Sequence, residues 1–200
     1  MKKNDIIKAA LGEFSKNSYD NASVNNMIKE SQTSKGTFYH YFKNKEELYL
    51  YLADIILRDK INFFKKTERE NETQNPKNIF ELFRLQVEKS IDFSLAYPEY
   101  TAFSIQTRKE TNEIIQEKMM KRMEFVSSDY YSIIKENIDK GIIRKDLPID
   151  FTVKILSYML TRFLEFLQTM DCELSIDNKN YIKEQYHYYI SFIEKGLSAE

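Results

Sequence analysis

Apolar residues recur every three to four positions along most of this chain, which is the spacing of one face of an α-helix. The pattern predicts helices over residues 4–17, 24–30, 35–41, 44–66, 76–95, 98–107, 110–140, 149–170 and 177–196. Turn-forming residues are scarce, with four Gly and three Pro among 200 residues, so a chain of many β-turns is disfavoured. We therefore expect an all-α protein of about nine helices.

Two of the predicted helices are short and closely spaced. Ser23 and Ser34 each precede an apolar run, and serine at this position is a typical N-cap. Helices 24–30 and 35–41 with a three-residue turn between them form a helix-turn-helix pattern. We expect a three-helix domain over residues 1–46 and a larger helical domain over 47–200, with the helix at 44–66 linking them.

The polar stretch after the fourth helix separates two parts of the chain. Residues 67–75 contain no apolar side chain, which predicts a linker. Pro76 is expected at the first position of the fifth helix, where its missing N–H costs nothing. Gly141 is expected just beyond the seventh helix, in the left-handed conformation that often ends a helix.

Charge is distributed unevenly along the chain. Residues 1–45 hold eight Lys and four acidic residues, while residues 46–200 hold 22 basic and 27 acidic ones. This asymmetry is expected if the N-terminal end alone meets a polyanion, because the net charge of the whole chain is only −1. Chance clustering on a solvated face would explain the charges equally well.

The second short helix has the composition of a DNA-reading helix. Such a helix needs small or polar residues at its N-terminal end, where it meets base edges in the major groove. Those residues are Ser34, Lys35, Gly36 and Thr37, with His40 one turn later. Phosphate contacts are expected from Ser23, Tyr39, Lys43 and Lys45. Phe38, Tyr41 and Phe42 are expected to face inward, and an ordinary helical hairpin is the plain alternative.

The same residues resemble a known family. Phe14, the pair Tyr19-Asp20, the pair Ser23-Val24 and the run from Ser34 to Leu48 follow the pattern of the TetR (tetracycline repressor) family of transcriptional regulators. The resemblance covers residues 6–52. It implies a homodimer that binds a double-stranded DNA operator through its first three helices. The fourth helix would link the two parts. Helices five to nine would dimerise and bind a small apolar or aromatic effector of unknown identity, which releases the repressor from its operator.

Three residues depart from the family pattern. Ser18 and Gln32 stand where the family usually has Gly, and Ile28 replaces a small Ala. A turn Gly often serves a positive φ angle, and Gln in that conformation would cost on the order of 1 kcal/mol. We expect these positions to affect how the helices dock rather than the fold itself.

Aromatic and methionine side chains are frequent in the larger domain, and they suit an apolar pocket. The candidate ligand-binding residues are Tyr100, Phe103, Met119, Met123, Phe125, Tyr130, Tyr158 and Phe163. Ordinary core packing is the competing interpretation for each of them.

The eighth predicted helix is apolar on nearly every side, so one side is expected to meet another subunit. The Tyr-rich stripe of the ninth helix suggests the same role, giving a four-helix bundle between two subunits. The candidate interface residues are Phe151, Ile155, Met159, Phe166, Tyr181, Tyr186, Tyr189 and Ile193.

Other classes of site find little support in the sequence. No catalytic constellation or cofactor-binding motif is present, so we expect no enzyme. Glu184 and His187 match a single unit of a di-iron motif that needs two, so no metal site is expected. The single cysteine, with no signal peptide or membrane-spanning run, predicts a cytoplasmic protein. A helical carrier or enzyme without DNA binding, or a regulator controlled by a protein partner, remains the alternative.

Overall fold

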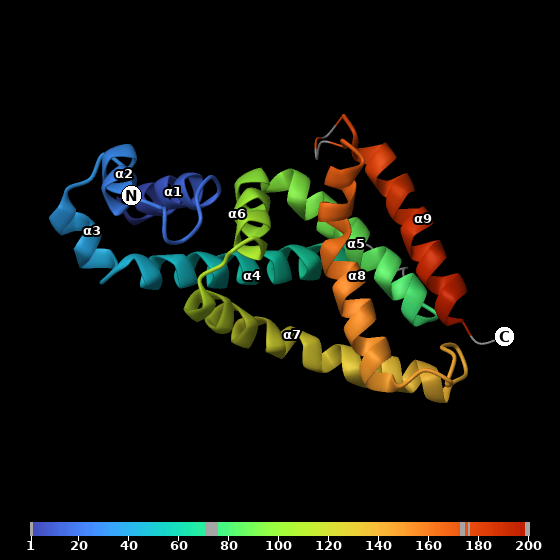
Figure 1. Ribbon diagram of the computed structural model, residues 1–200. Coiled ribbons are helices and arrows are strands. Elements are labelled where there is room, and N and C mark those ends of the chain that lie inside the picture. The colour runs from blue at the N-terminus through green and yellow to red at the C-terminus, as the bar shows by residue number, and fades with distance from the viewer. Residues whose placement is uncertain (1, 71–75, 173–174, 176, 199–200) are drawn as a thin grey trace. The chain divides into compact units, whose positions relative to one another are not determined.

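The computed structural model describes residues 2–70, 76–172, 175 and 177–198, without the side chains of 67–70, 123–130, 161, 164 and 168. Every named element in this part of the chain is an α-helix, from α1 at the N-terminus to α9 at the C-terminus (Figure 1). An isolated antiparallel bridge between Ile143 and Ser198 is the single β-type pairing among the described residues. The predicted all-α class is therefore confirmed.

The chain divides into two compact units. The first contains Met1–Lys65 and Tyr97–Lys121, and the second contains Lys66–Ala96 and Arg122–Glu200. These units are defined by contacts and not by function, so the predicted functional boundary near residue 46 stays a prediction. Both α4 (Lys45–Glu70) and α7 (Glu113–Asp139) contribute residues to each unit.

The first unit is built around α1 (Lys2–Phe14), which packs against three other helices. These are α2 (Val24–Glu30), α3 (Lys35–Tyr41) and α6 (Pro98–Arg108). Phe14 of α1 meets Tyr49 of α4 edge to face with ring centroids 4.9 Å apart, and Tyr49 in turn lies 5.1 Å from Phe103 of α6. Because all three rings are buried, this cluster joins the short N-terminal helices to α4 and α6 through apolar contact.

The second unit contains α5 (Ile79–Ala96), α8 (Ile149–Thr169) and α9 (Lys179–Leu197). Tyr186 of α9 is buried, and its hydroxyl donates to the backbone oxygen of Phe83 at 3.0 Å. Its ring meets Phe163 of α8 with centroids 4.8 Å apart. A tyrosine whose ring fills the core and whose hydroxyl finds a carbonyl buries no unsatisfied polar group.

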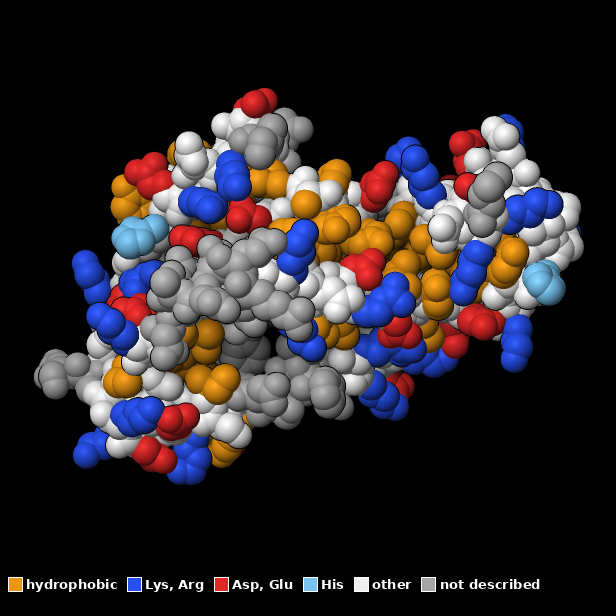
Figure 2. Space-filling view, turned by 180° about the vertical axis from the view of Figure 1, so that it is seen from behind, with side chains coloured by type: hydrophobic (Ala, Val, Ile, Leu, Met, Phe, Trp, Pro, Cys, Tyr) orange, Lys and Arg blue, Asp and Glu red, His pale blue; other side chains and the backbone are white. Residues whose placement is uncertain are grey.

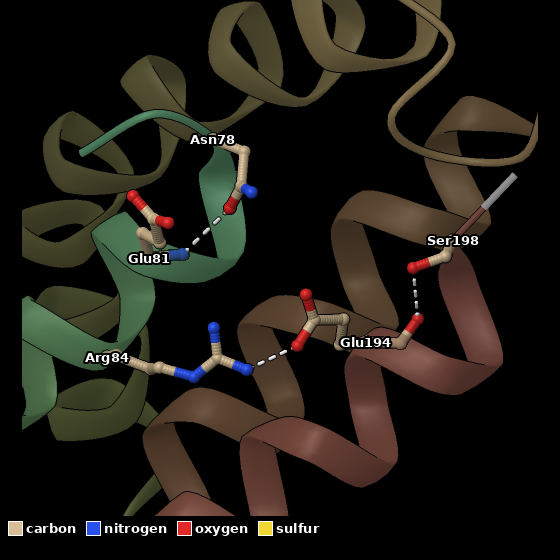
Figure 3. A network of polar contacts seen from close by, with 5 residues as sticks. All are labelled: Asn78, Glu81, Arg84, Glu194 and Ser198. Atoms are coloured by element: carbon tan, nitrogen blue, oxygen red, sulfur yellow. Dashed lines mark hydrogen bonds and ion pairs between the residues drawn. The ribbon is translucent and has the colours of Figure 1, made fainter.

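Polar side chains reinforce the pairing of α5 with α9. Figure 3 shows Arg84 of α5 pointing to Glu194 of α9, with which it forms an ion pair. The Ser198 hydroxyl donates to the Glu194 backbone oxygen at 2.8 Å. Arg144, which follows α7, donates its backbone N–H to the backbone oxygen of Leu197 at 2.8 Å. The end of α9 is therefore held from two directions.

Four predicted helix boundaries were wrong by three or four residues. Two of them are the end of α1, at Phe14 and not residue 17, and the start of α7, at Glu113 and not residue 110. Pro76 does not open α5, because Asn78 caps it: its Oδ1 accepts the Glu81 N–H at 2.9 Å. The Glu81 carboxylate also reaches back to the Lys77 N–H, one residue before the cap, at 2.7 Å. The predicted linker begins later than residue 67, since α4 continues to Glu70, and residues 71–75 lie outside the described part.

The left-handed turn after α7 was predicted correctly. Gly141 has φ 70°, and the next residue donates its N–H to the Asn137 backbone oxygen at 2.9 Å. None of the helices in the described ranges combines the length and apolar character that crossing a bilayer requires.

Candidate nucleic-acid interface

Both helices of the helix-turn-helix begin at a serine cap. The Ser23 hydroxyl accepts the Asn26 N–H at 3.3 Å, and the Ser34 hydroxyl accepts the Thr37 N–H at 3.0 Å. Ser34 and Thr37 also share a hydrogen bond between their hydroxyls at 2.9 Å. These bonds satisfy amides that a helix N-terminus leaves without partners, and they fix where α3 begins.

One side of α3 is buried and holds the helix in place. Phe38 is fully buried and Phe42, at its C-cap, is 2% exposed. Both belong to the core that α1 and α4 also line. Tyr41 was predicted to face inward with them, but 37% of it is exposed. Its ring meets His40 edge to face at 5.1 Å, so Tyr41 lies on the surface of the last turn.

The other side of α3 presents the residues expected to read DNA. Ser34, Lys35, Gly36 and His40 are exposed, Thr37 is half-buried and Tyr39 is 46% exposed. A Cβ atom built on Gly36 would meet only the Ser34 hydroxyl, at 3.8 Å. The backbone of this turn is therefore open to close approach by a ligand. Lys43 follows the helix and is also exposed.

Lys45 occupies a different environment from the other candidate phosphate contacts. Its Nζ donates to the backbone oxygens of Asp20 at 3.2 Å and Ala22 at 3.1 Å. It also lies 4.6 Å from the ring centre of Tyr19, a favourable position for a cation over an aromatic face. Two of its three donors are thus engaged with the loop between α1 and α2.

The turn between α2 and α3 has the conformation that the sequence predicted. Gln32 has φ 51°, in the left-handed region that favours glycine. The Ser31 hydroxyl donates to the backbone oxygen of Ile28 at 3.1 Å and shares a hydrogen bond with the Thr33 hydroxyl at 2.8 Å. These side-chain bonds help hold the turn despite the strain at Gln32.

Two carboxylates that the sequence analysis did not single out organise the loop before α2. Glu13 accepts the backbone N–H of Ser23 at 2.9 Å, and Glu110 accepts that of Tyr19 at 2.7 Å. Glu13 and Ser23 are ten residues apart. They meet because α1 ends just before the turn that leads to α2. The Glu110 contact spans 91 residues, and no local pattern signals a partner so distant.

The candidate ligand-binding residues fall into several environments. In the first unit, Phe103 is buried in the aromatic cluster, Met119 is half-buried, and the Tyr100 hydroxyl donates to Asp59 at 3.1 Å. Burial and this bond raise the pKa of Tyr100 to about 12. In the second unit, Phe163 is buried and Tyr158 is 61% exposed. The side chains of Met123, Phe125 and Tyr130 lie outside the described residues.

The candidate subunit-interface residues divide by burial. Tyr186 and Ile193 lie inside the core of the second unit, while Ile155, Met159 and Tyr189 are half-buried. Phe151, Phe166 and Tyr181 are exposed, as are Tyr188 and Phe192, which the sequence analysis did not select. Hydrophobic side chains also reach the surface in the view of Figure 2, among Lys, Arg, Asp and Glu side chains.

Other chemistries find no matching arrangement in the described ranges. No group of three or more His, Cys, Asp or Glu side chains is placed there to hold a metal ion. What the residues around α3 do form is a capped, amphipathic helix that follows α2 after a tight turn and exposes small, polar and basic side chains. This arrangement defines a DNA-binding protein of the helix-turn-helix class.

Comparisons with known proteins make the class specific. Residues 6–52 match the bacterial regulatory proteins of the tetR family. The chain is 30% identical to the HTH-type transcriptional regulator QacR of Staphylococcus aureus strain Mu50 over 135 residues, which covers 67% of this chain and 69% of QacR. This chain belongs to the TetR family of transcriptional regulators, as its sequence motif predicted, and it is a DNA-binding regulator rather than an enzyme.

Similarity extends beyond the helix-turn-helix. The HTH-type transcriptional repressor AcnR of Corynebacterium glutamicum is 22% identical over 167 residues, covering 82% of this chain and 81% of AcnR. The crystal structure of the transcriptional regulator FadR from Bacillus subtilis, in complex with stearoyl-CoA, superposes with a TM-score of 0.65 at 19% identity. That match covers 91% of this chain and 96% of FadR, so the helical fold is shared over most of the chain.

Proposed function

We propose that this protein is a homodimeric repressor whose α3 helices read a near-palindromic operator. The observation that carries the proposal is the exposed N-terminal half of α3, where Lys35, Gly36 and Thr37 stand beside the Ser34 cap. Lys35, Thr37 and His40 would contact base edges or the groove. Tyr39 and Lys43 would contact phosphates, with the Ser23 hydroxyl. The similarity to the repressor AcnR supports repression over activation, and the cytoplasm, where operator DNA lies, is the expected location.

Lys45 has a modified role in this proposal. Because two of its donors already bond the loop between α1 and α2, at most one remains for a phosphate. We therefore propose that it acts first by fixing the loop and second by adding positive charge near the DNA.

Two copies would join through the aromatic surface of α8 and α9. In α8 the exposed Phe151, Tyr158 and Phe166 recur at helical spacing, with Ile155 half-buried between them. In α9 the exposed Tyr181, Tyr188 and Phe192 form a second stripe. We call these six exposed residues the aromatic surface. Exposed apolar side chains in this number favour association, and a two-fold pair of α3 helices suits two operator half-sites.

An effector would release the DNA by binding one conformer better than another. FadR was crystallised with stearoyl-CoA, whose acyl chain is apolar, and an apolar group of this kind is consistent with the aromatic content of this chain. Within the first unit, Tyr100, Phe103 and Met119 remain candidates for its site. Within the second unit the separate candidates are Phe163, Met123, Phe125 and Tyr130, of which the last three have side chains outside the described residues. Tyr158 is better explained by the aromatic surface, because its side chain is largely exposed.

An electrophoretic mobility shift with DNA from upstream of the protein's own coding region tests the proposal. Unlabelled DNA of the same sequence should compete at least tenfold better than random DNA of equal length. Long-chain acyl-CoA and uncharged aromatic compounds, added in turn, screen for the effector. Equal competition by both DNAs would contradict sequence-specific binding.

A further inference from the structure

Glu110 lies between α6 and α7 and holds the loop that leads into the helix-turn-helix. Only 3% of the residue is exposed. Its Oε2 accepts the backbone N–H of Tyr19 at 2.7 Å, while Oε1 accepts those of Thr111 at 3.0 Å and Asn112 at 3.1 Å. A buried carboxylate bound by backbone amides forms charge-assisted bonds, which are stronger than neutral ones. One side chain therefore joins the α1–α2 loop to the start of α7.

Asn112 makes a second connection at the same place. Its Nδ2 donates to the Asp20 carboxylate at 2.9 Å, while its Oδ1 accepts the Ile115 N–H at 3.1 Å and so caps α7. The Gln116 amide also donates to the backbone oxygen of Glu110 at 2.5 Å. Because Asn112 uses one atom for the helix and the other for the loop, a movement of the first turn of α7 pulls on the loop.

The loop itself has little freedom to absorb such a movement. Lys45 holds the carbonyls of Asp20 and Ala22, and Glu13 holds the amide of Ser23. Beyond Ser23 come α2 and α3, of seven residues each. Helices this short are not stable alone, so their positions depend on tertiary contacts. A shift at Tyr19 and Asp20 would therefore reach α2, and through it α3.

We infer that Glu110, assisted by Asn112, is a positioning residue for operator binding, and that the α6–α7 junction sets the affinity of α3 for its operator. Glu110 lies well outside residues 6–52, which carry the family motif. The inference rests on the proposed function in taking α3 as the DNA-reading helix. It adds that reading depends on a carboxylate in the polypeptide that follows α6.

The main test is Glu110→Gln, which keeps the shape of the side chain but replaces one acceptor oxygen by a donor. Fluorescence anisotropy should show at least tenfold weaker binding to the fragment upstream of the protein's own coding region. Binding to random DNA should change less than twofold, because Lys35 and Lys43 are untouched. The matched control is Glu117→Gln, an exposed carboxylate on α7 whose ion pair is with Lys121; its affinity for either DNA should stay within twofold of wild type.

Asn112→Ser gives a second measurement that does not disturb Glu110. Serine can still cap α7 but cannot reach Asp20, so operator binding should weaken about threefold with little change in the melting temperature. Hydrogen exchange of the Tyr19 amide should become faster in Glu110→Gln while amides in α9 stay unchanged. A purely structural role would instead lower operator and random-DNA binding together, along with the folded fraction.

The outcomes separate the two proposals. If wild-type protein prefers its operator and a folded Glu110→Gln binds it within twofold of wild type, this inference is wrong and the proposed function stands. If Glu110→Gln does not fold at the assay temperature, unchanged operator binding by Asn112→Ser overturns the inference in the same way. Wild-type protein with no operator preference would overturn both.

Discussion

Helices α3 and α9 are both amphipathic, yet their exposed faces differ in chemistry. Each buries a stripe of large side chains. In α3 these are Phe38 and, at the C-cap, Phe42; in α9 they are Ile182, Tyr186 and Ile190. The exposed face of α3 carries Lys35, Gly36 and His40, whereas that of α9 carries Tyr181, Tyr188 and Phe192. Burial of one face stabilises each helix in its unit. The chemistry of the exposed face indicates what kind of molecule the helix binds.

The difference follows from what each face meets. Lysine ammonium groups stay hydrated until they displace counterions from phosphates, so an exposed basic surface is soluble by itself and binds DNA in a salt-dependent way. Exposed aromatic rings are stabilised when another apolar surface removes them from water, by roughly 25 cal/mol per Å². The first surface suits a polyanion, and the second suits a second protein surface.

The largest effect is expected from charging the aromatic surface of α9. Tyr188→Glu with Phe192→Glu should give a monomer in equilibrium sedimentation at micromolar concentration, because buried carboxylates would lack partners. Operator affinity should then fall by about 100-fold or more, since two linked α3 helices bind with a high effective concentration. Asn180→Glu, at an exposed position of α9, is the control and should remain dimeric. A dimeric double variant would contradict the assignment of this surface.

A smaller effect on DNA binding is expected from substitutions in and next to α3, where contacts to bases can be separated from contacts to phosphates. Lys35→Ala should lower the preference for operator over random DNA by about tenfold, the loss of about 1–2 kcal/mol of base discrimination. Lys43→Ala and Tyr39→Phe should weaken binding to all sequences alike, and Lys43→Ala should reduce the salt slope by about one. Binding isotherms at several salt concentrations measure both. Similar loss of preference in all three variants would show that α3 does not divide its contacts in this way.

Lys60 of α4 provides a contrast with the exposed lysines near α3. Burial, with Arg108 nearby, lowers its pKa to about 8. The unfolded chain binds the proton more tightly, so the cost of charging Lys60 is fully present below pH 8 and disappears as the pH rises toward 10.5. Lys60→Met should therefore raise the free energy of unfolding at pH 7 by about 1–2 kcal/mol, since Lys60 keeps partial solvent access. Urea unfolding at pH 7 and pH 9.5 should show the difference shrinking; a constant difference would argue against a desolvated ammonium.

The smallest effect is expected from relieving the left-handed turns. Gln32→Gly should stabilise the protein by about 0.5–1 kcal/mol, because glycine adopts φ 51° without strain. Asp171 has φ 52° in the second unit, but Asp tolerates this conformation better than Gln. Asp171→Gly should therefore stabilise the protein less than Gln32→Gly does. Thermal unfolding of the two variants tests which one is more stable. Destabilisation by Gln32→Gly would mean that its side chain contributes more than its strain costs.

Much of the N-terminal unit could be predicted from sequence because its signals are local. Ser23 and Ser34 cap helices whose amides lie three residues away, and Gln32 stands at a turn that requires positive φ. Tyr41 was assigned wrongly because its type suits both a core and a surface. Periodicity over seven residues constrains a helix face too weakly to decide between them.

The second unit was predicted less completely. The ninth helix was correctly recognised, but Tyr186 and Ile193 were grouped with Tyr181 as candidates for the subunit interface. Tyr186 and Ile193 face α5 and the core, whereas Tyr181 is exposed. The sequence of α9 has apolar residues on more than one side of the helix, so periodicity alone does not identify the buried side. The packing of α5 and α8 against one side decides which residues stay exposed.

By itself, the sequence determined the helical class, the Ser23 and Ser34 caps, the left-handed turns at Gln32 and Gly141 and the TetR family, because each depends on residues a few positions apart. The tertiary structure decided which side of α9 is exposed, where the Tyr41 ring lies, and that Glu110 holds the amide of Tyr19. Those outcomes depend on contacts between distant segments, such as the 91 residues that separate Glu110 from Tyr19. A backbone amide has no sequence signature, so its carboxylate partner becomes visible only when the chain is folded.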